Sequence, residues 1–460
     1  MTTTPQPHAV IIGAGIAGLS TAYWLGEAGW RTTVLETKPS IAPGGHIMHI
    51  FGPGRGTLKR MGVLEHIAAS PFLSSDSVLR DSRGKELSRA AYADLYDDIN
   101  VVATRRGDLA LAIYKVLPES ATVRFGAQVD TMRDHLDRVE VVLDDGEVIW
   151  GDLLIGADGQ ASMVRELYWE GEKWALPLGY WYAYYDADTD QGLPDYSQTY
   201  TSAGHSDVLF APQKGCATAL HIWREDHVKP PKDDELIYDL IQRVTAKSKN
   251  PTVMKVLEAA EKAGKIPVLL PAYMVSPDKW HKWRVVLVGD AAHCLSILSS
   301  QGAGMSIASA EVLGEELGKA KGDIYGGALT RWEDRVRPSI ERLQARTQVA
   351  AKKLIPKHRP ASKVRSLLTK MMGDDLNGAI QALGVMEEVE LAELDEHKAV
   401  MAAVNELILK ARAEKRKAAE KKTATETKEG TDTADRAENK VEGEAGVDKK
   451  IAPGTLGSLS

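Results

Sequence analysis

The stretch HAVIIGAGIAGLSTAYWLGEAGWRTTVLE, from His8 to Glu36, decides the fold. An apolar run leads into a glycine-rich bend, then into an apolar segment of helical character, and then into a second apolar run that ends at an acidic residue. Buried strands that alternate with helices are typical of an open, mainly parallel sheet. The stretch therefore predicts a strand, a helix that begins near Ile16, and a second strand over TTVLE.

The bend carries Gly13, Gly15 and Gly18 in the spacing G-x-G-x-x-G. In a dinucleotide-binding unit the first glycine permits the tight turn, the second lets a pyrophosphate approach the backbone, and the third lets the helix pack close to the strand. Free N–H groups and the helix dipole favour an anion at such a helix start. Glu36 stands where a carboxylate accepts hydrogen bonds from a ribose 2′-hydroxyl and repels a 2′-phosphate. The bend predicts bound FAD or NAD rather than NADP, with a bend that serves only packing as the alternative.

The composition of the 460 residues limits the class of protein. A formal charge of −7 gives no overall attraction to nucleic acid or to an anionic membrane. Cys216 and Cys294 lie far apart and lack metal-ligand spacing, which favours a reducing compartment over a disulfide framework. The first residues do not resemble a signal peptide, and no apolar stretch is long enough to span a bilayer. We expect a cytoplasmic protein with no membrane span, no nucleic-acid partner and no metal site.

Strand and helix signals alternate along the chain, except in an aromatic, β-rich middle segment. GYWYAYYDAD, QTYTSAG, DVLFAP and CATALHIWRED predict a separate sheet, which a helix over DDELIYDLIQRVTA interrupts. RVVLVGD then returns to the buried-strand pattern, so the α/β domain is expected to be discontinuous. The expected parts are a flexible N-terminus (1–7), a dinucleotide-binding domain in three pieces (8–72, 101–175 and 281–345), a substrate-domain hairpin (73–100), a substrate-binding sheet (176–280), a helical region (346–414) and a disordered charged tail (415–460).

Two later stretches, LLIGADGQASMVR and VVLVGDAAHCLSILSSQGAGMSIASAEVLGEEL, resemble the two other fingerprints of the single-component, FAD-dependent aromatic hydroxylases. These are the para-hydroxybenzoate hydroxylase-like monooxygenases, which include tetracycline-inactivating enzymes. The resemblance covers about residues 8 to 345, with three motifs in the family's order. It implies an α/β fold in which a Rossmann-like FAD-binding domain carries an inserted, mostly antiparallel β-sheet substrate domain and C-terminal helices. It also implies tightly bound FAD, with NADPH or NADH as a transient reductant and O2 as the oxidant.

The resemblance implies roles for residues around the flavin. Asp290 is expected to hydrogen-bond the ribityl chain. Gly302 and Ala303 open a helix, predicted from Met305, whose N–H groups and dipole stabilise negative charge on the reduced ring. Asp158 is expected near the pyrophosphate.

Arginines are the second group of candidates. Arg106 resembles the arginine that family members place on the flavin, and Arg105 is the competing candidate. Arg165 follows Asp158 in the second motif, and its alternative role is a surface salt bridge.

Other residues near these motifs have simpler interpretations. His293 and Cys294 invite acid–base and nucleophilic roles, but local packing is the favoured interpretation of both. Because alternate residues of a strand share a face, about half of the aromatic cluster is expected to line a substrate site and half to pack elsewhere. The cluster consists of Tyr180, Trp181, Tyr182, Tyr184 and Tyr185. Relatives usually carry proline where Leu295, Ile297 and Leu298 stand here, so the shape of that loop is expected to differ.

The function implied by the resemblance is insertion of one oxygen atom from O2 into an aromatic or polyketide-like small molecule, through a flavin C4a-hydroperoxide. Hydroxylation, epoxidation and Baeyer–Villiger insertion all use this species, and the sequence leaves the three open, together with the oligomeric state. One alternative is a flavin-dependent halogenase or reductase on the same scaffold, although the Trp-x-Trp-x-Ile-Pro signature of tryptophan halogenases is absent. Another is a non-catalytic flavoprotein that acts through its C-terminal region.

Overall fold

The computed structural model describes residues 6–68, 76–91, 101–189, 193, 196–211, 215–229, 236–246, 250–320, 322 and 324–355. These residues all belong to the first of the two units into which the chain divides, Met1–Asp395, and the second, Glu396–Ser460, lies outside the described part. The tail expected over 415–460, and the helical region expected over 346–414 from residue 356 onward, also lie outside the described residues.

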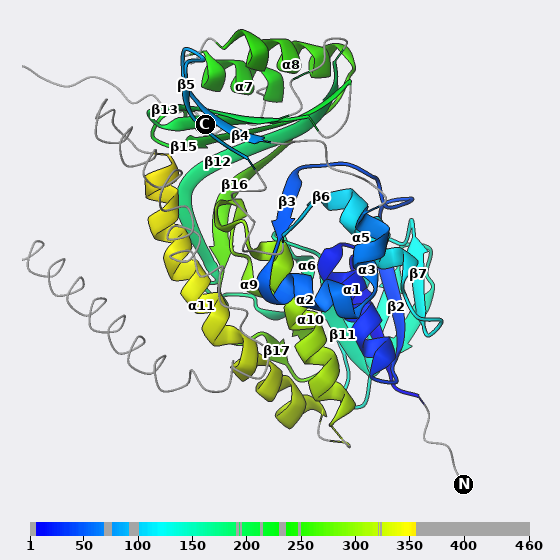
Figure 1. The fold of residues 1–460 in the computed structure, drawn as a ribbon. Helices are drawn as coiled ribbons and strands as arrows, with labels where there is room; N and C mark the ends of the chain where they lie inside the picture. The colour runs from blue at the N-terminus through cyan, green and yellow to red at the C-terminus, as the bar shows by residue number, and fades with distance from the viewer. Residues whose placement is uncertain are drawn as a thin grey trace, which may run out of the picture. The chain divides into compact units, whose positions relative to one another are not determined.

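A mainly parallel sheet forms the centre of the part of the fold that begins at the N-terminus (Figure 1). The stretch that opens it folds as the sequence predicts, since α1 (Ile16–Glu27) follows the first strand and leads into the second. Within the described residues its strand order is β17 (His281–Lys282), β18 (Val285–Leu287), β11 (Leu153–Gly156), β1 (His8–Ile12), β2 (Arg31–Glu36) and β7 (Ala121–Phe125). All neighbours are parallel except β17 and β18. One sheet is thus built from segments that lie far apart in the chain.

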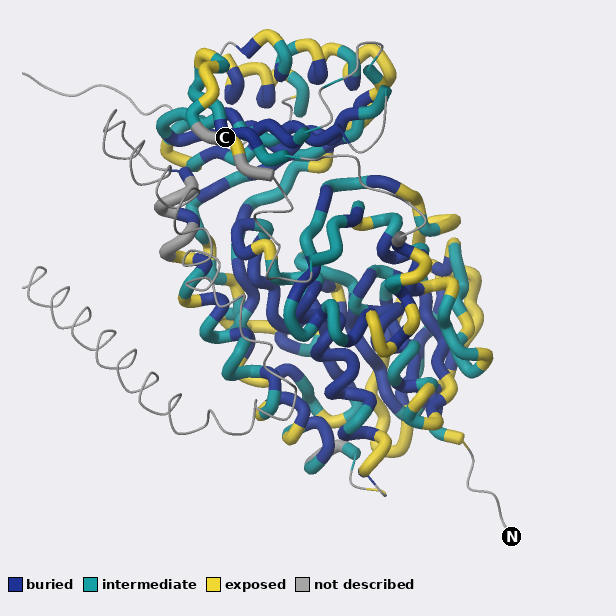
Figure 2. The backbone as a smooth tube through the Cα atoms, in the orientation of Figure 1, coloured by how far each residue is buried: buried dark blue, intermediate teal, exposed yellow. Residues whose placement is uncertain are grey.

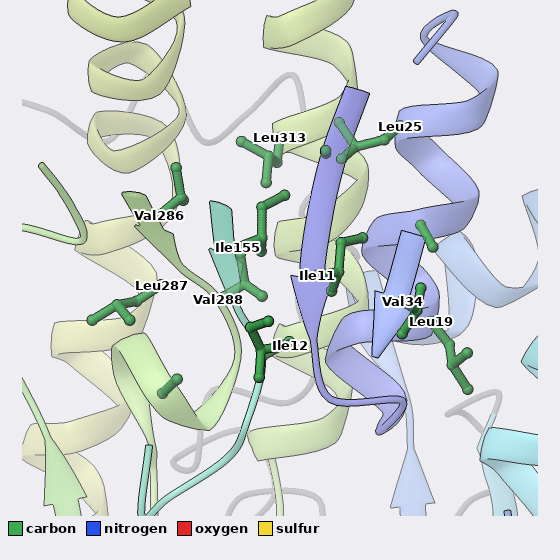
Figure 3. Close-up of a cluster of buried hydrophobic side chains, with 14 of the residues drawn as sticks. Ile11, Ile12, Leu19, Leu25, Val34, Ile155, Val286, Leu287, Val288 and Leu313 are labelled. Carbon is green, nitrogen blue, oxygen red and sulfur yellow. The ribbon is translucent and has the colours of Figure 1, made fainter. Parts of the chain in front are cut away.

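The core of this part lies between the parallel sheet and the helices α1 and α10 (Gly302–Gly318). Figure 3 shows Ile11 and Ile155 on neighbouring strands, with Leu19 of α1 and Leu313 of α10 close by. These four side chains have no exposed surface. Full burial of each such side chain contributes about 1.5–3 kcal/mol, so the two helices are held firmly against the strands.

A second sheet is mostly antiparallel, and its two faces pack against different elements of the chain. Its order within the described residues is β16 (Val268–Val275), β12 (Ala175–Asp188), β15 (Cys216–Arg224), β14 (His205–Phe210), β13 (Ser197–Ser202), β4 (Asp76–Asp81) and β5 (Glu86–Ala91). Only the β13–β4 pair is parallel. Figure 1 shows α7 (Ile237–Thr245) and α8 (Pro251–Lys262) covering one face. The opposite face packs against Leu298 and against Ala351 of α11 (Leu329–Leu354).

Smaller elements complete the described fold. A three-stranded sheet contains β8 (Val129–Asp134), β9 (Val139–Leu143) and β10 (Val148–Gly151), and β3 (Ile47–Ile50) pairs with β6 (Val102–Arg105). The remaining helical segments are α2 (Gly52–Arg60), α3 (Val63–Ala68), α5 (Arg106–Lys115), α6 (Met163–Tyr168), α9 (Asp290–His293), the 3-10 turn η1 (Ile297–Ser299) and the π turn η2 (Ile324–Ala328). Figure 2 shows that buried backbone concentrates in the two large sheets and in α10. None of the described helices combines the length and the apolar character that a membrane crossing needs.

The structure corrects two expectations about helices. The helix predicted from Met305 begins at Gly302, because Gly302, Ala303 and Gly304 form its first turn, where residues need no intrahelical acceptor for their N–H groups. The middle segment contains α8 in addition to the one helix that was predicted. Asn250 caps α8, with its side chain accepting from Thr252 N and Val253 N at 2.9 and 3.3 Å.

Candidate functional site

The bend between β1 and α1 leaves no room for a side chain at Gly13 or at Gly18. Gly13 has φ +103°, and a Cβ there would lie 2.7 Å from the carbonyl oxygen of Ala157. A Cβ on Gly18 would lie 2.0 Å from the carbonyl oxygen of Gly13. The bend therefore requires glycine at both positions, and it places β1 directly against the segment that follows β11.

The start of α1 is open and uncapped. Gly15 is the N-cap, no side chain of the described residues caps the helix, and a Cβ on Gly15 would meet none of their atoms within 4 Å. The first turn carries no acidic residue, so its free N–H groups and the helix dipole favour an anion here. Beside it, the half-buried Glu36 accepts hydrogen bonds from Ala14 N and Lys38 N, both at 3.0 Å. Two backbone N–H groups thus fix the carboxylate next to the bend.

The second motif contains an unsatisfied carboxylate oxygen and a fully buried arginine. Oδ2 of Asp158 accepts from Val164 N at 3.1 Å, whereas its buried Oδ1 has no hydrogen-bond partner among the described residues. Arg165 donates to the carbonyl oxygens of Ala291 and Gln160, at 2.9 and 2.6 Å. Burial lowers the pKa of Arg165 from its ordinary value. The alternative of a surface salt bridge is therefore wrong, because this side chain is internal and joins the second motif to the third.

The third motif brings α1 and α10 together. Gly289, with φ +58°, precedes α9, and a Cβ on it would lie 2.5 Å from Ala17 Cβ and 3.2 Å from Ser306 Oγ. A Cβ on Gly302 would lie 3.6 Å from Oδ1 of Asp290. Together with the contact between Gly13 and Ala157, these contacts bring all three motifs to one place in the fold.

Asp290 is a carboxylate in a poorly solvated setting at the start of α10. Burial raises the pKa of Asp290 above its ordinary value, and Arg106, the Cys294 thiol and Arg165 oppose this rise. Gly302 and Ala303 form the first helical turn beside it, and that turn contains no acidic residue. A carboxylate here is suited to accept hydrogen bonds from hydroxyl groups, which would compensate for its lost water.

The two candidate arginines differ in their partners. Nε of Arg105 lies 2.5 Å from Oδ2 of Asp108, and the other oxygen of Asp108 accepts from Gly44 N at 3.1 Å. Arg106 is exposed and forms no ion pair with any described residue. Its charge nevertheless acts on Asp290, as noted, and on His46. The charge of Arg105 is thus paired with Asp108, whereas the guanidinium of Arg106 remains available for an anionic or electron-rich ligand.

His293 and Cys294 are buried packing residues. The His293 ring lies 4.8 Å from the Trp280 ring, and burial lowers the pKa of His293 to about 4. Burial also raises the pKa of the Cys294 thiol well above its ordinary value, so the thiolate that a nucleophile needs is disfavoured. The structure therefore agrees with the local packing that was expected of both side chains.

The aromatic cluster of β12 divides between the two faces of its sheet. Tyr180, Tyr182 and Tyr184 pack with Leu298 on one face, and Trp181 and Tyr185 pack with the α7–α8 cluster on the other. The alternation expected from the strand pattern is therefore confirmed.

Sequence reasoning missed His46 and Asp186 at this place. The His46 ring meets the Tyr184 ring edge-on at 5.0 Å. Burial and the charge of Arg106 lower the pKa of His46 to about 4, against the opposing effect of Asp186. Oδ2 of Asp186 accepts from Gly45 N at 3.0 Å. No local sequence signal marks these contacts, because they join segments about 140 residues apart.

The loop over residues 295–300, for which the family resemblance predicts proline, has an unusual backbone. Ser296 and Ser300 have φ of +65° and +56°, and they flank the turn that presents Ile297 and Leu298. Positive φ is costly for residues other than glycine and is typical of constrained functional loops. The expectation that this loop has its own shape is consistent with these angles.

Comparisons with known proteins indicate which family of proteins this chain belongs to. The FAD binding domain family matches residues 7–347. An uncharacterised protein of Mycobacterium tuberculosis is 30% identical over 361 residues, which cover 73% of this chain and 91% of the relative. An FAD-dependent monooxygenase of Sarocladium schorii is 27% identical over 378 residues, which cover 74% of this chain and 86% of the relative.

Solved structures show the same fold. The tetracycline destructase Tet(55) superposes with a TM-score of 0.73 at 21% identity, covering 84% of this chain and 100% of its own. Klebsiella pneumoniae HpxO, complexed with FAD and uric acid, gives a TM-score of 0.68 at 21% identity, covering 82% of this chain and 97% of its own. The chain therefore belongs to the FAD binding domain family and is an FAD-dependent monooxygenase.

Proposed function

We propose that this protein uses NADPH or NADH and O2 to insert one oxygen atom into a flat, aromatic or polyketide-like small molecule. The observation that carries the proposal is the convergence of three motifs: a Cβ on Gly13 would clash with Ala157, and one on Gly289 would clash with Ala17. Bound FAD would supply the oxygen chemistry, since the reduced cofactor reacts with O2 and passes one oxygen atom to a substrate.

The residues present fit FAD. The uncapped start of α1 at Gly15 suits the diphosphate, and Glu36 suits the adenosine ribose. The unsatisfied Oδ1 of Asp158 marks a place where a polar ligand or water is expected. Asp290 would hold ribityl hydroxyls. Each group supplies what a different part of the cofactor needs.

Two further groups would act on the ring of the flavin. The N-terminus of α10, at Gly302 and Ala303, offers N–H groups and a positive dipole end to the negative charge that develops on reduction. The unpaired guanidinium of Arg106 would lie on the cofactor.

The substrate would bind against the Tyr182 and Tyr184 face of β12. This face shares one apolar cluster with Ile297 and Leu298, and aromatic side chains favour contact with flat rings. An apolar wall also excludes water from the reacting groups. His46, neutral because burial lowers its pKa to about 4, adds a polar group at Tyr184 without adding charge. The uric acid bound by HpxO supports a compact, planar substrate class.

Turnover under 18O2 with a panel of phenols, purines and polycyclic polyketides tests the proposal. We expect a panel compound to accelerate both NAD(P)H oxidation and O2 uptake, and to gain one 18O atom. The matched control is the same reaction under 16O2 in H218O, in which the product should carry no label. A compound that accelerates NAD(P)H oxidation but is recovered unchanged, with H2O2 as the sole oxygen product, contradicts the proposal.

A further inference from the structure

A cluster of two histidines and one aspartate lies on the face of the seven-stranded sheet that α7 and α8 cover. His205 and Asp207 are two residues apart on β14, so their side chains share a face. His221 on β15 stands opposite Asp207 in the strand register. Leu209 and Trp223, on the same face of these strands, pack with the helices. This His–Asp–His cluster therefore lies on the side of the sheet away from Tyr182 and Tyr184.

The three side chains are close enough to share one ion. Oδ1 of Asp207 lies 2.6 Å from Nδ1 of His221 and 2.7 Å from Nε2 of His205. The three ligand atoms lie within 4.8 Å of one another, and no side chain of the cluster is more than 1% exposed. A zinc ion binds imidazole nitrogen and carboxylate oxygen at about 2.0–2.2 Å, so small side-chain movements would suffice to admit one.

Two atoms of the cluster lack hydrogen bonds within the described structure. Nε2 of His205 has no hydrogen-bond partner, even though Oδ1 of Asp207 lies near it, and the buried Oδ2 of Asp207 has none either. Among the described residues, no lysine or arginine pairs with this carboxylate. A buried carboxylate without a cation is costly, and a buried histidine nitrogen without a partner adds to the cost.

We infer that His205 Nε2, His221 Nδ1 and the Asp207 carboxylate bind one divalent transition-metal ion, which we assign as Zn²⁺. The ion would satisfy the His205 nitrogen and Oδ2 of Asp207 together and would neutralise the carboxylate. The hydroxyl of Tyr185 lies 3.0 Å from Nε2 of His221, and a hydrogen bond from the outer ring nitrogen is the usual way in which a metal-binding histidine is oriented. Such an ion would tie β14 to β15 beneath the two covering helices.

Zinc loading of the full-length protein with its flavin tests the inference. The protein is treated with a chelator, dialysed against Zn²⁺ and washed, and its metal content is measured. We expect one Zn²⁺ per chain and a higher thermal unfolding temperature with Zn²⁺ than without it. The variants H221Q and D207N should not bind this Zn²⁺ ion. H135Q, which changes a histidine whose side chain is 41% exposed, should retain it.

A second measurement covers the case in which the buried variants do not fold. X-ray absorption at the zinc edge of the wild-type protein should show two imidazole ligands and oxygen, without sulfur. Three results would overturn the inference: folded wild-type protein that takes up no Zn²⁺, a folded H221Q or D207N variant that keeps the full equivalent, or a sulfur ligand at the edge. A metal-free result would show that the three side chains form a hydrogen-bonded network instead of a metal site.

Discussion

At the scale of single residues, Gly13 has the least freedom to change. Its φ of +103° and the 2.7 Å approach of a Cβ to Ala157 exclude every side chain. A positive φ alone costs a non-glycine residue about 1–3 kcal/mol. We predict that G13A lowers the affinity for FAD by at least about tenfold, which a fluorescence titration of the flavin measures.

Gly29 offers the matched control. It has φ +85° with nothing within 4 Å of a Cβ, so G29A introduces the strain without a clash near the bend. This variant should lower the thermal unfolding temperature modestly and leave FAD affinity unchanged. Equal losses of affinity in both variants would show that the bend does not hold the cofactor.

The buried carboxylate of Asp290 is expected to lower the stability of the FAD-free protein and to strengthen the binding of FAD. Burial raises its pKa above the ordinary 3.8, so the folded apoprotein holds this proton more tightly than the unfolded chain does. Ionisation therefore costs stability as pH rises through and above 3.8. We predict that FAD-free D290N is more stable than FAD-free wild type at neutral pH, that the difference disappears in acid, and that D290N binds FAD more weakly.

Thermal unfolding from neutral pH down to about pH 4, with and without FAD, checks this prediction. D137N is the control, because the side chain of Asp137 is 79% exposed and its removal should change neither stability nor FAD affinity. An FAD-free D290N that is less stable than wild type at neutral pH would contradict the interpretation.

At the scale of elements, the contact between α2 and α10 sets the position of the α10 N-terminus. A Cβ on Gly54 would lie 2.5 Å from Cα of Gly304. Further along, the buried Glu311 accepts from Arg60 Nε and Thr57 Oγ1, each at 2.5 Å. The two helices are therefore held in close, fixed contact.

We predict that G54A costs about 1–3 kcal/mol of stability through overpacking and also weakens FAD binding, because α10 must move. G56A is the matched control on the same helix. Its Cβ would meet only the end of the Arg60 side chain, at 3.4 Å. Alanine is the better helix former, so G56A should be neutral or stabilising. Chemical unfolding and FAD titration of both variants measure the effects, and an unaffected G54A would be contrary to the described packing.

Some elements could be predicted from the sequence and others could not. Within the segment 73–100, where the sequence predicts a hairpin, β4 and β5 pair through a tight turn in which Asp81 N donates to Lys85 O and Gly84 has φ +83°. α8 was missed although Asn250 and the apolar spacing after it are a usable start signal. α2 was beyond local reasoning, since its glycines and proline are poor helix formers and tertiary packing stabilises it.

At the scale of the whole molecule, pairing over long distances limits what the sequence can predict. Ile11 pairs with Ile155, and Ile155 pairs with Val286, yet no local signal reports that order. The closeness of the three motifs could be predicted from the sequence, and their cofactor roles remain predictions. The contacts of His46 and Asp186 could not be predicted, because they depend on how the two sheets meet.

The residues proposed to hold FAD all lie between Gly13 and Ala303. We predict that a chain ending at residue 414 retains FAD and substrate-stimulated NAD(P)H oxidation. Turnover of the shortened and full-length proteins, each normalised to flavin content, measures this. Loss of all function with FAD retained would favour the alternative of a flavoprotein that acts through its C-terminal region.

The identity and amount of the molecule released when the purified protein is heated test the proposed FAD site most directly. We predict FAD, identified by mass spectrometry, at one equivalent per chain after incubation with excess cofactor and desalting. A folded, colourless protein that binds no added FAD would contradict the cofactor site and the oxygen insertion proposed with it.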